Sequence, residues 1–297
     1  MKKVLKWIGI VLGAILGLIV LLVLGLFMRG SLRLSQVYNP PPDNITIPTD
    51  AASLARGKHI ANIVCIDCHG ADLGGKIGWF NFPPAGQVDS ANLTSGQGGI
   101  GKTFTDADYV RVLRHGVDEQ GHGTFMVAAL TTQNMSDADL GAVVAYVKTV
   151  PPVDRVTNGM QFTPLARVLL GAGVMPWPAD MVSNNGHISA PAPGVNVEYG
   201  KYLVDSIGCR DCHSGNLAGG PYPEPGTTFT VPNITPGSET KSWTDAQFIQ
   251  TIRTGVTPSG HQFVELMPWK TYNNATDDEL KAIWMYIQSQ PPLPQNK

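Results

Sequence analysis

The sequence of 297 residues lacks an excess of basic residues outside its N-terminus. Residues 1–35 hold five of the 21 lysines and arginines and none of the 23 acidic residues, so 16 basic residues face 23 acidic ones in the remainder. An acidic body repels phosphate backbones, which argues against nucleic acid as a partner. The sequence also lacks a Ser-His-Asp or paired-carboxylate arrangement of the kind used in hydrolysis.

Charge is absent from one long run near the N-terminus, Trp7 to Met28, which contains 22 residues. At about 1.5 Å per residue this run spans roughly 33 Å, enough to cross the hydrocarbon core of a bilayer. It exceeds the apolar core of a secretory signal and no convincing cleavage site follows, so we expect an uncleaved signal anchor. The lack of a polar face argues against a helix of a soluble core. Lys2, Lys3 and Lys6 favour a cytoplasmic N-terminus, with the rest of the chain exported.

Cysteine is also scarce, and its four occurrences form two tight pairs that are each followed by histidine. The two motifs are Cys65-x-x-Cys68-His69 and Cys209-x-x-Cys212-His213. Cys-x-x-Cys-His is the attachment signature of a c-type haem, in which the thiols bind the porphyrin and the imidazole binds the iron. Zinc is the alternative, but each zinc site would need a fourth ligand. The sequence therefore predicts two covalently attached haem c groups.

The two motifs lie in a duplicated segment, whose copies we call copy one and copy two. The offset between matching residues drifts only from 144 to 139 along the copies. The matched elements are Arg56-Gly57-Lys58 with Tyr199-Gly200-Lys201, Asn92-Leu93-Thr94 with Asn233-Ile234-Thr235, Thr105-Asp106-Ala107 with Thr244-Asp245-Ala246, Arg114 with Arg253, Gly121-His122 with Gly260-His261, and Pro151-Pro152 with Pro291-Pro292. Two copies of one domain are predicted.

Each copy has a helical pattern with long loops. Apolar residues recur at i, i+3, i+4 and i+7 near the end of each copy: Leu140, Val143, Val144 and Val147, then Leu280, Ile283, Trp284 and Ile287. We predict an all-α fold with two tandem domains after one N-terminal transmembrane helix. The expected divisions are an anchor at 1–30, an extended spacer at 31–49, domain 1 at 50–152, a linker at 153–195 with one helix near 165–174, and domain 2 at 196–297.

A second axial ligand is needed for each iron, and methionine is the expected residue. Met267, followed by Pro268, is the candidate in copy two. Met126 is in the corresponding place in copy one, but Val127 follows it, and Met135 and His122 are alternatives. A thioether ligand raises the reduction potential, which suits electron relay.

Other polar and aromatic residues have weaker signals. Arg114 and Arg253 recur in both copies, which fits either a partner for haem propionates or a solvated surface residue. Histidines without a counterpart in the other copy are given no ligand role; these are His59, His115 and His187. Aromatic residues are expected to line the haem pocket of copy two; these are Trp243, Trp269 and Tyr286.

Over residues 50–293 the chain resembles class I cytochrome c. More narrowly, it is similar to membrane-bound multihaem cytochromes such as the cytochrome c subunits of bacterial alcohol and gluconate dehydrogenases. The resemblance rests on both Cys-x-x-Cys-His motifs together with Asn92-Leu93-Thr94, Asn233-Ile234-Thr235, Met267-Pro268 and Pro151-Pro152. It implies two tandem class I cytochrome c domains. Those subunits have three haems and a C-terminal anchor, whereas this sequence has two motifs and an N-terminal anchor.

The resemblance and the motifs together predict an electron carrier or an electron-transfer subunit. It would pass electrons between a membrane or periplasmic donor, such as a quinol-oxidising complex or a dehydrogenase, and a downstream acceptor. The haem domains would lie on the periplasmic side of the cytoplasmic membrane. The alternative is a dihaem enzyme such as a cytochrome c peroxidase, which needs one open iron position; the irregular segment Gly121–Thr132 keeps it open.

Overall fold

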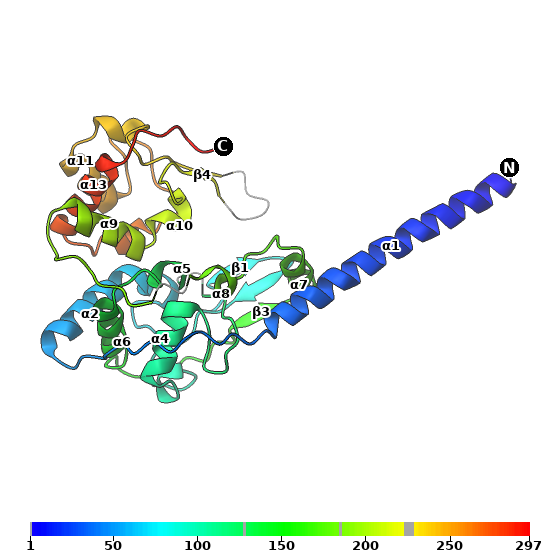
Figure 1. Cartoon of the computed structure of the whole chain (residues 1–297), viewed down its shortest axis with the longest axis horizontal. Helices are drawn as coiled ribbons and strands as arrows, with labels where there is room; N and C mark the ends of the chain where they lie inside the picture. Colours follow the sequence, from blue (N-terminus) through cyan, green and yellow to red (C-terminus); the bar gives the residue numbers. More distant parts are fainter. Residues whose placement is uncertain (1, 127–128, 184–185, 223–228) are drawn as a thin grey trace.

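Helices dominate the computed structural model, which describes residues 2–126, 129–183, 186–222 and 229–297 (Figure 1). A long helix, α1 (Lys2–Leu34), projects away from the rest of the chain, and the two copies lie beside one another at its far end (Figure 1). The short helices of copy one and its flanking segments are α3 (Ile66–His69), η1 (Ile100–Lys102), α5 (Ala129–Thr132), α7 (Pro164–Gly171) and α8 (Pro178–Met181). Those of copy two are α10 (Cys209–His213), η2 (Glu239–Ser242) and α12 (Trp269–Tyr272).

The first and last helices of each copy cross at a glycine. In copy one, α2 (Ala51–Val64) packs on α6 (Asp137–Val147), and a Cβ on Gly57 would lie 1.9 Å from the carbonyl oxygen of Ala142. In copy two, α9 (Val197–Ser206) packs on α13 (Asp277–Ser289), and a Cβ on Gly200 would lie 1.9 Å from the carbonyl oxygen of Ala282. The duplication is therefore also a duplication of tertiary structure.

The two predicted apolar patterns are confirmed, and local capping signals accompany the helices in both copies. The eight apolar residues of the two i, i+3, i+4, i+7 patterns are all buried. Helices α4 (Asp106–His115) and α11 (Asp245–Thr254) each begin with a capping box, at Thr105 and at Thr244. Both end at a glycine with positive φ, Gly116 and Gly255, a conformation that other residues rarely adopt. Local signals thus set where these helices begin and end.

The all-α expectation is only approximately correct, because short strands occur in both copies. A three-stranded antiparallel sheet contains β1 (Phe80–Phe82), β2 (Gly86–Val88) and β3 (Met160–Phe162). Copy two has a two-stranded ladder of β4 (Gly220–Pro221) and β5 (Thr230–Val231). Strands of two or three residues are too short to show the alternation by which a sequence announces a strand.

The segment between the copies packs on copy one. It supplies β3, α7 and α8. Helix α7 matches the one helix expected near residues 165–174, whereas α8 was not expected. Its aromatic and aliphatic residues join a cluster around Phe125 and Trp177, which also receives Leu34 and Tyr38 from the chain after the anchor. The predicted boundaries of linker and domains remain predictions.

The stretch expected as a spacer, 31–49, is partly helical and is held against copy one. α1 continues through Leu34. Beyond it, Ile45 and Ile47 pack on the core of copy one, and the Asp43 carboxylate accepts a 2.6 Å hydrogen bond from Nε2 of the buried His115 ring. The extended chain is therefore fixed along the domain surface.

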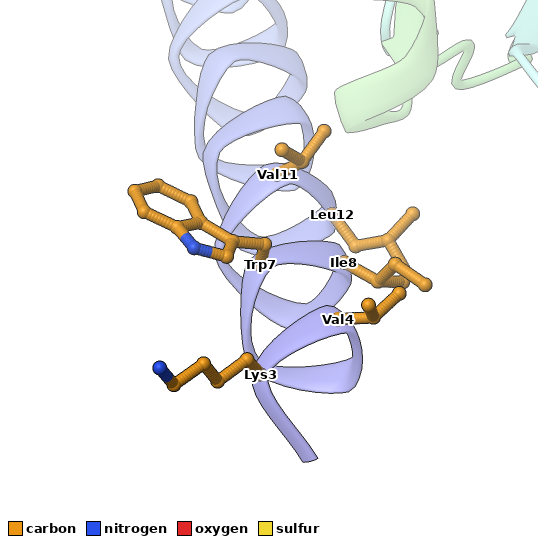
Figure 2. Close-up of a pocket in the computed structure, with 6 residues that line it drawn as sticks. All are labelled: Lys3, Val4, Trp7, Ile8, Val11 and Leu12. Carbon is orange, nitrogen blue, oxygen red and sulfur yellow. The ribbon is translucent and has the colours of Figure 1, made fainter. Parts of the chain in front are cut away.

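Helix α1 is long and apolar enough to cross a membrane, and none of its most apolar 18-residue window is buried. Figure 2 shows a hollow lined by six side chains near its N-terminus, and all six come from α1 itself. These residues are Lys3, Val4, Trp7, Ile8, Val11 and Leu12. A hollow made by one helix alone is a gap between neighbouring side chains, so we assign it no ligand.

We predict that Gly200→Ala destabilises copy two, because the added methyl group would overlap the Ala282 carbonyl of α13. Overpacking of this kind costs about 1–3 kcal/mol of unfolding free energy. Denaturant unfolding in detergent, followed by circular dichroism, measures the effect. Gly215→Ala is the control, since no atom lies within 4 Å of the Cβ position there. Equal stability of the two variants would contradict the crossing.

Candidate haem sites

Each Cys-x-x-Cys-His motif follows directly on the first helix of its copy. Cys65 is the C-terminal cap of α2, and the short helix α3 then carries Cys68 and His69. In copy two, α10 carries Cys209, Cys212 and His213 after the left-handed Gly208. In both copies a short helical segment therefore carries the two thiols and the imidazole at positions i, i+3 and i+4.

The histidines are oriented by equivalent hydrogen bonds to the backbone. Nδ1 of His69 donates to the carbonyl oxygen of Ala91 at 2.7 Å, and Nδ1 of His213 donates to that of Pro232 at 2.8 Å. Burial lowers the pKa of both imidazoles, so they are neutral at pH 7. With Nδ1 as the donor, Nε2 is the atom that can bind iron.

The cysteines fit haem attachment better than zinc binding. All four are free of disulfides, and burial raises the pKa of the Cys65, Cys68 and Cys209 thiols to about 12. Within the described part of the chain, no group of three or more His, Cys, Asp or Glu residues is arranged to hold a metal ion.

The repeated Asn-x-Thr element closes the loop behind each histidine. The side-chain oxygen of Asn92 accepts hydrogen bonds from the backbone and hydroxyl of Thr94, and its amide donates to the carbonyl of Val153. Asn233 makes the same bonds with Thr235 and Leu293. Val153 and Leu293 each follow a proline pair, so the element ties the end of each copy to its haem loop. The sequence displayed the repetition but not this role.

Met267 lies where a second axial ligand for copy two is expected, between a hairpin and α12. It is partly buried and packs on the core of copy two with Trp243 and Phe263. The backbone N–H of Phe263 donates to Gly255 at 2.7 Å and closes the hairpin. The assignment of Met267 as a ligand remains a prediction.

Met126 is half-buried, and its register differs from that of Met267. The equivalent hairpin in copy one closes with Thr124, which donates to Gly116 at 2.8 Å. From Thr124 to the end of α5 at Thr132 is one residue fewer than from Phe263 to the end of α12 at Tyr272. Met126 therefore lies six residues before the end of α5, whereas Met267 lies five residues before the end of α12. Val127 is outside the described residues, and Met126 stays a predicted ligand.

The two alternatives to Met126 have other environments. Met135 is 2% exposed and lies in the core of copy one, where its counterpart in copy two is the buried Ala275. The backbone N–H of His122 donates to Asp118 at 2.7 Å in the hairpin turn, and its ring is half-exposed. These positions favour Met126 over both alternatives.

The repeated arginines fasten the methionine-bearing segment to the last helix, a role neither sequence interpretation included. Arg114 is 1% exposed and donates to the carbonyls of Gln133 and Met135 and to the Asp137 carboxylate. In copy two, Arg253 donates to the equivalent groups, which are the carbonyls of Asn273 and Ala275 and the carboxylate of Asp277.

The two copies meet through an interface with an approximate two-fold relation, which brings both haem motifs toward each other. Asn134 of copy one donates to the carbonyl of Asp205, at 3.3 Å, and the equivalent Asn274 donates to the carbonyl of Asn62, at 3.0 Å. Both carbonyls lie within four residues of the first cysteine of a motif. Thr131 of α5 also hydrogen-bonds Asp211, inside the second motif.

Charged and phenolic side chains fill the centre of this interface. Arg56 binds both oxygens of Asp139 at 2.9 Å and reaches Glu279 of copy two at 3.1 Å. His59 lies 2.8 Å from the other Glu279 oxygen, and Tyr202 of copy two donates to Asp139 at 2.6 Å. Glu279 is 7% exposed, and its cationic neighbours and hydrogen bonds hold its pKa down to about 2 despite burial. The sequence analysis gave His59 no role.

Comparison with known proteins divides the chain in the same way. Residues 54–151 match the family described as cytochrome c, and residues 195–287 match the family described as cytochrome c oxidase, cbb3-type, subunit III. The fructose dehydrogenase cytochrome subunit of Gluconobacter japonicus is 26% identical over 90% of this chain and 57% of that protein. The alcohol dehydrogenase (quinone) cytochrome c subunit of Gluconobacter oxydans is 26% identical over 84% of this chain and 57% of that protein.

A relative of more similar length is also found. A diheme cytochrome c-type protein of Cereibacter sphaeroides is 28% identical over 66% of this chain and 68% of that protein. The chain thus spans little more than half the length of the two dehydrogenase subunits. No peroxidase is among these relatives, and the peroxidase alternative has no support from them.

We predict that Glu279→Gln lowers the unfolding free energy at pH 7 by about 2 kcal/mol, because Arg56 loses an anionic partner in a mostly buried site. The folded-state pKa of Glu279 is about 2 and its ordinary value is 4.5, so the carboxylate contributes its full stabilisation above pH 4.5. That contribution disappears as the pH falls through 4.5 toward 2. Denaturant unfolding across this range should therefore show the two proteins converging at low pH.

The matched control for this variant is Glu265→Gln. The Glu265 side chain is 90% exposed, and its carboxylate forms an ion pair with Lys270. Exposed pairs contribute little, so we expect no measurable change in the unfolding free energy. A gap between wild type and Glu279→Gln that stays constant down to pH 3 would contradict the assigned interaction.

Proposed function

From the premise that this chain is a c-type cytochrome with two covalently attached haem c groups, we propose that it transfers electrons outside the cytoplasm between a membrane or periplasmic donor and a downstream acceptor. Each haem iron supplies one-electron redox chemistry when bound. The observation that carries the proposal is the duplicated site, in which a neutral, backbone-oriented histidine follows two free cysteines in each copy.

The proposed axial ligands are His69 and Met126 for the first haem and His213 and Met267 for the second. The thioethers of Cys65 and Cys68, and of Cys209 and Cys212, attach the porphyrins. Methionine ligation closes the iron to substrates and raises the potential, which suits relay rather than turnover. Arg114 and Arg253 support this arrangement by holding the segment between each methionine and the last helix.

Electrons are proposed to pass directly from one haem to the other. The support is the interface between the copies, where α5 contacts Asp211 of the second motif and Asn274, after α12, contacts the backbone just before the first motif. Arg56, Asp139 and Glu279 fix the relative position of the two copies. A fixed separation between two redox groups gives a constant rate of transfer between them.

The proposed location is the cytoplasmic membrane, with α1 as a single span, the N-terminus in the cytoplasm and both haem domains on the periplasmic side. The apolar window of α1 and the lysines at its start support this orientation. The proposed donor is a quinol-oxidising complex or a dehydrogenase. Support comes from relatives named as cytochrome subunits of dehydrogenases.

We predict two methionine-ligated haems per chain, measured as the far-red sulfur-to-iron charge-transfer absorption of the oxidised protein. Met267→Ala and Met126→Ala should each remove about half of this absorption, because each iron loses one thioether. Met285→Ala is the control, since Met285 is 40% exposed on α13. Loss in Met267→Ala without loss in Met126→Ala would show that a different group ligates the first iron.

The relay itself is tested by stopped-flow reduction and reoxidation of the full chain. Both haems should be reduced rapidly by a quinol-linked donor and reoxidised rapidly by a small c-type cytochrome. Slow, independent reduction of the two haems would contradict direct transfer between them.

A further inference from the structure

Helix α7 lies against the end of the membrane-spanning helix, and the contact is made backbone to backbone. A Cβ on Gly30 of α1 would lie 1.8 Å from the carbonyl oxygen of Arg167, and a Cβ on Gly171 would lie 1.9 Å from that of Leu26. Figure 1 shows α7 beside the part of α1 that adjoins copy one. Glycines on both helices permit this close approach, as they do between helices in membranes.

The direction of α7 places its C-terminal end at the level of the apolar run. Leu26 is opposite Gly171 and Gly30 is opposite Arg167, so the two helices are antiparallel. Arg167 reaches Ser31 at 3.5 Å, in agreement with that direction. Leu26 belongs to the uncharged run that ends at Met28, so the turn after Gly171 lies at the depth of the last residues of the span.

The outer face of α7 is apolar. Its inner face, with Ala166 and Leu170 fully buried, packs in the cluster around Trp177. The remaining stripe contains Leu165, Val168 and Ala172, at a spacing of three and four residues. A helix on an aqueous surface normally shows polar residues on its outer face, whereas the one charged side chain of α7, Arg167, reaches toward Ser31 of α1.

The exposed apolar surface continues into the turn after α7 and is bordered by cations. Val174 is 45% exposed and Leu165 is 40% exposed. Arg29 is exposed on α1 near the same level, and Arg33 pairs with Asp180 just beyond it. The exposed Arg29 beside an apolar edge matches the phosphates and acyl chains of a phospholipid surface.

We propose that α7 and the turn Ala172–Val174 insert into the outer leaflet of the bilayer, at the boundary between headgroups and acyl chains. This inference rests on the proposed membrane anchor. The occupant of the apolar face is lipid, because the face is continuous with the side of a helix that is itself surrounded by lipid. Copy one is thereby held on the membrane surface, and the orientation of the haem domains does not depend on a flexible tether.

The test uses the full chain in lipid nanodiscs of phosphatidylethanolamine and phosphatidylglycerol. A spin label is placed at Val174→Cys, and its collisions with oxygen, which concentrates in lipid, are compared with those with a water-soluble nickel chelate. The native cysteines are occupied by thioether bonds, so the introduced thiol alone is labelled. Val195→Cys is the matched control, since Val195 is 44% exposed and precedes copy two. Leu18→Cys, in the middle of α1 and 68% exposed, reports the span.

We expect the Val174 label to favour oxygen over the nickel chelate by several-fold, as the Leu18 label does, and the Val195 label to show the reverse. A Val174 label that behaves like the Val195 label, with the Leu18 label in lipid, would overturn the inference and leave the anchor intact. A Val174 label shielded from both reagents would mean that protein covers the face, which also overturns it. A Leu18 label in water would refute the anchor itself. Haem absorption of each labelled variant verifies that it is folded.

Discussion

The close crossing of the first and last helices is the constraint on which each copy depends. Backbone meets backbone at Gly57 and Ala142, and at Gly200 and Ala282, with no room for a side chain between them. Because the first helix runs directly into the Cys-x-x-Cys-His turn, this crossing fixes the attachment site relative to the last helix. The arginine that fastens the methionine segment binds the first turn of that same last helix. The histidine of each site and the segment that follows the predicted methionine ligand are therefore both positioned by this one crossing.

Duplication produced an interface that is symmetric in backbone and asymmetric in chemistry. Asn134 and Asn274 make the same contact in opposite directions. At the centre, however, copy one supplies Arg56 and His59 where copy two supplies Tyr199 and Tyr202, and these residues face Glu279 and Asp139. Two identical copies of the first domain could not reproduce this pairing of two carboxylates with one arginine, one histidine and a tyrosine. The asymmetry favours pairing of copy one with copy two over pairing of two identical copies.

The membrane end of the molecule shows how much of copy one is made from sequence outside it. The strand β3, helix α7 and the chain after the anchor all pack around Phe125 and Trp177. Copy one consequently has a second apolar cluster that copy two lacks among the described residues. This cluster includes Phe125, which precedes Met126, and Leu34, at the end of α1. The register difference at Met126 therefore lies in the same part of copy one that packs against the end of the anchor helix.

The sequence by itself determined the haem chemistry, the duplication, the apolar faces of the last helices and the apolar span, because each is recorded in local motifs, spacings or periods of the chain. The tertiary structure alone decided the short strands, the contacts of the buried Arg114 and of the partly buried His59, and the facing of the two haem motifs. It also revealed the one-residue difference in register between Met126 and Met267. These features join residues up to 223 positions apart, as Arg56 and Glu279 are, and no local period or spacing records which distant groups will be neighbours.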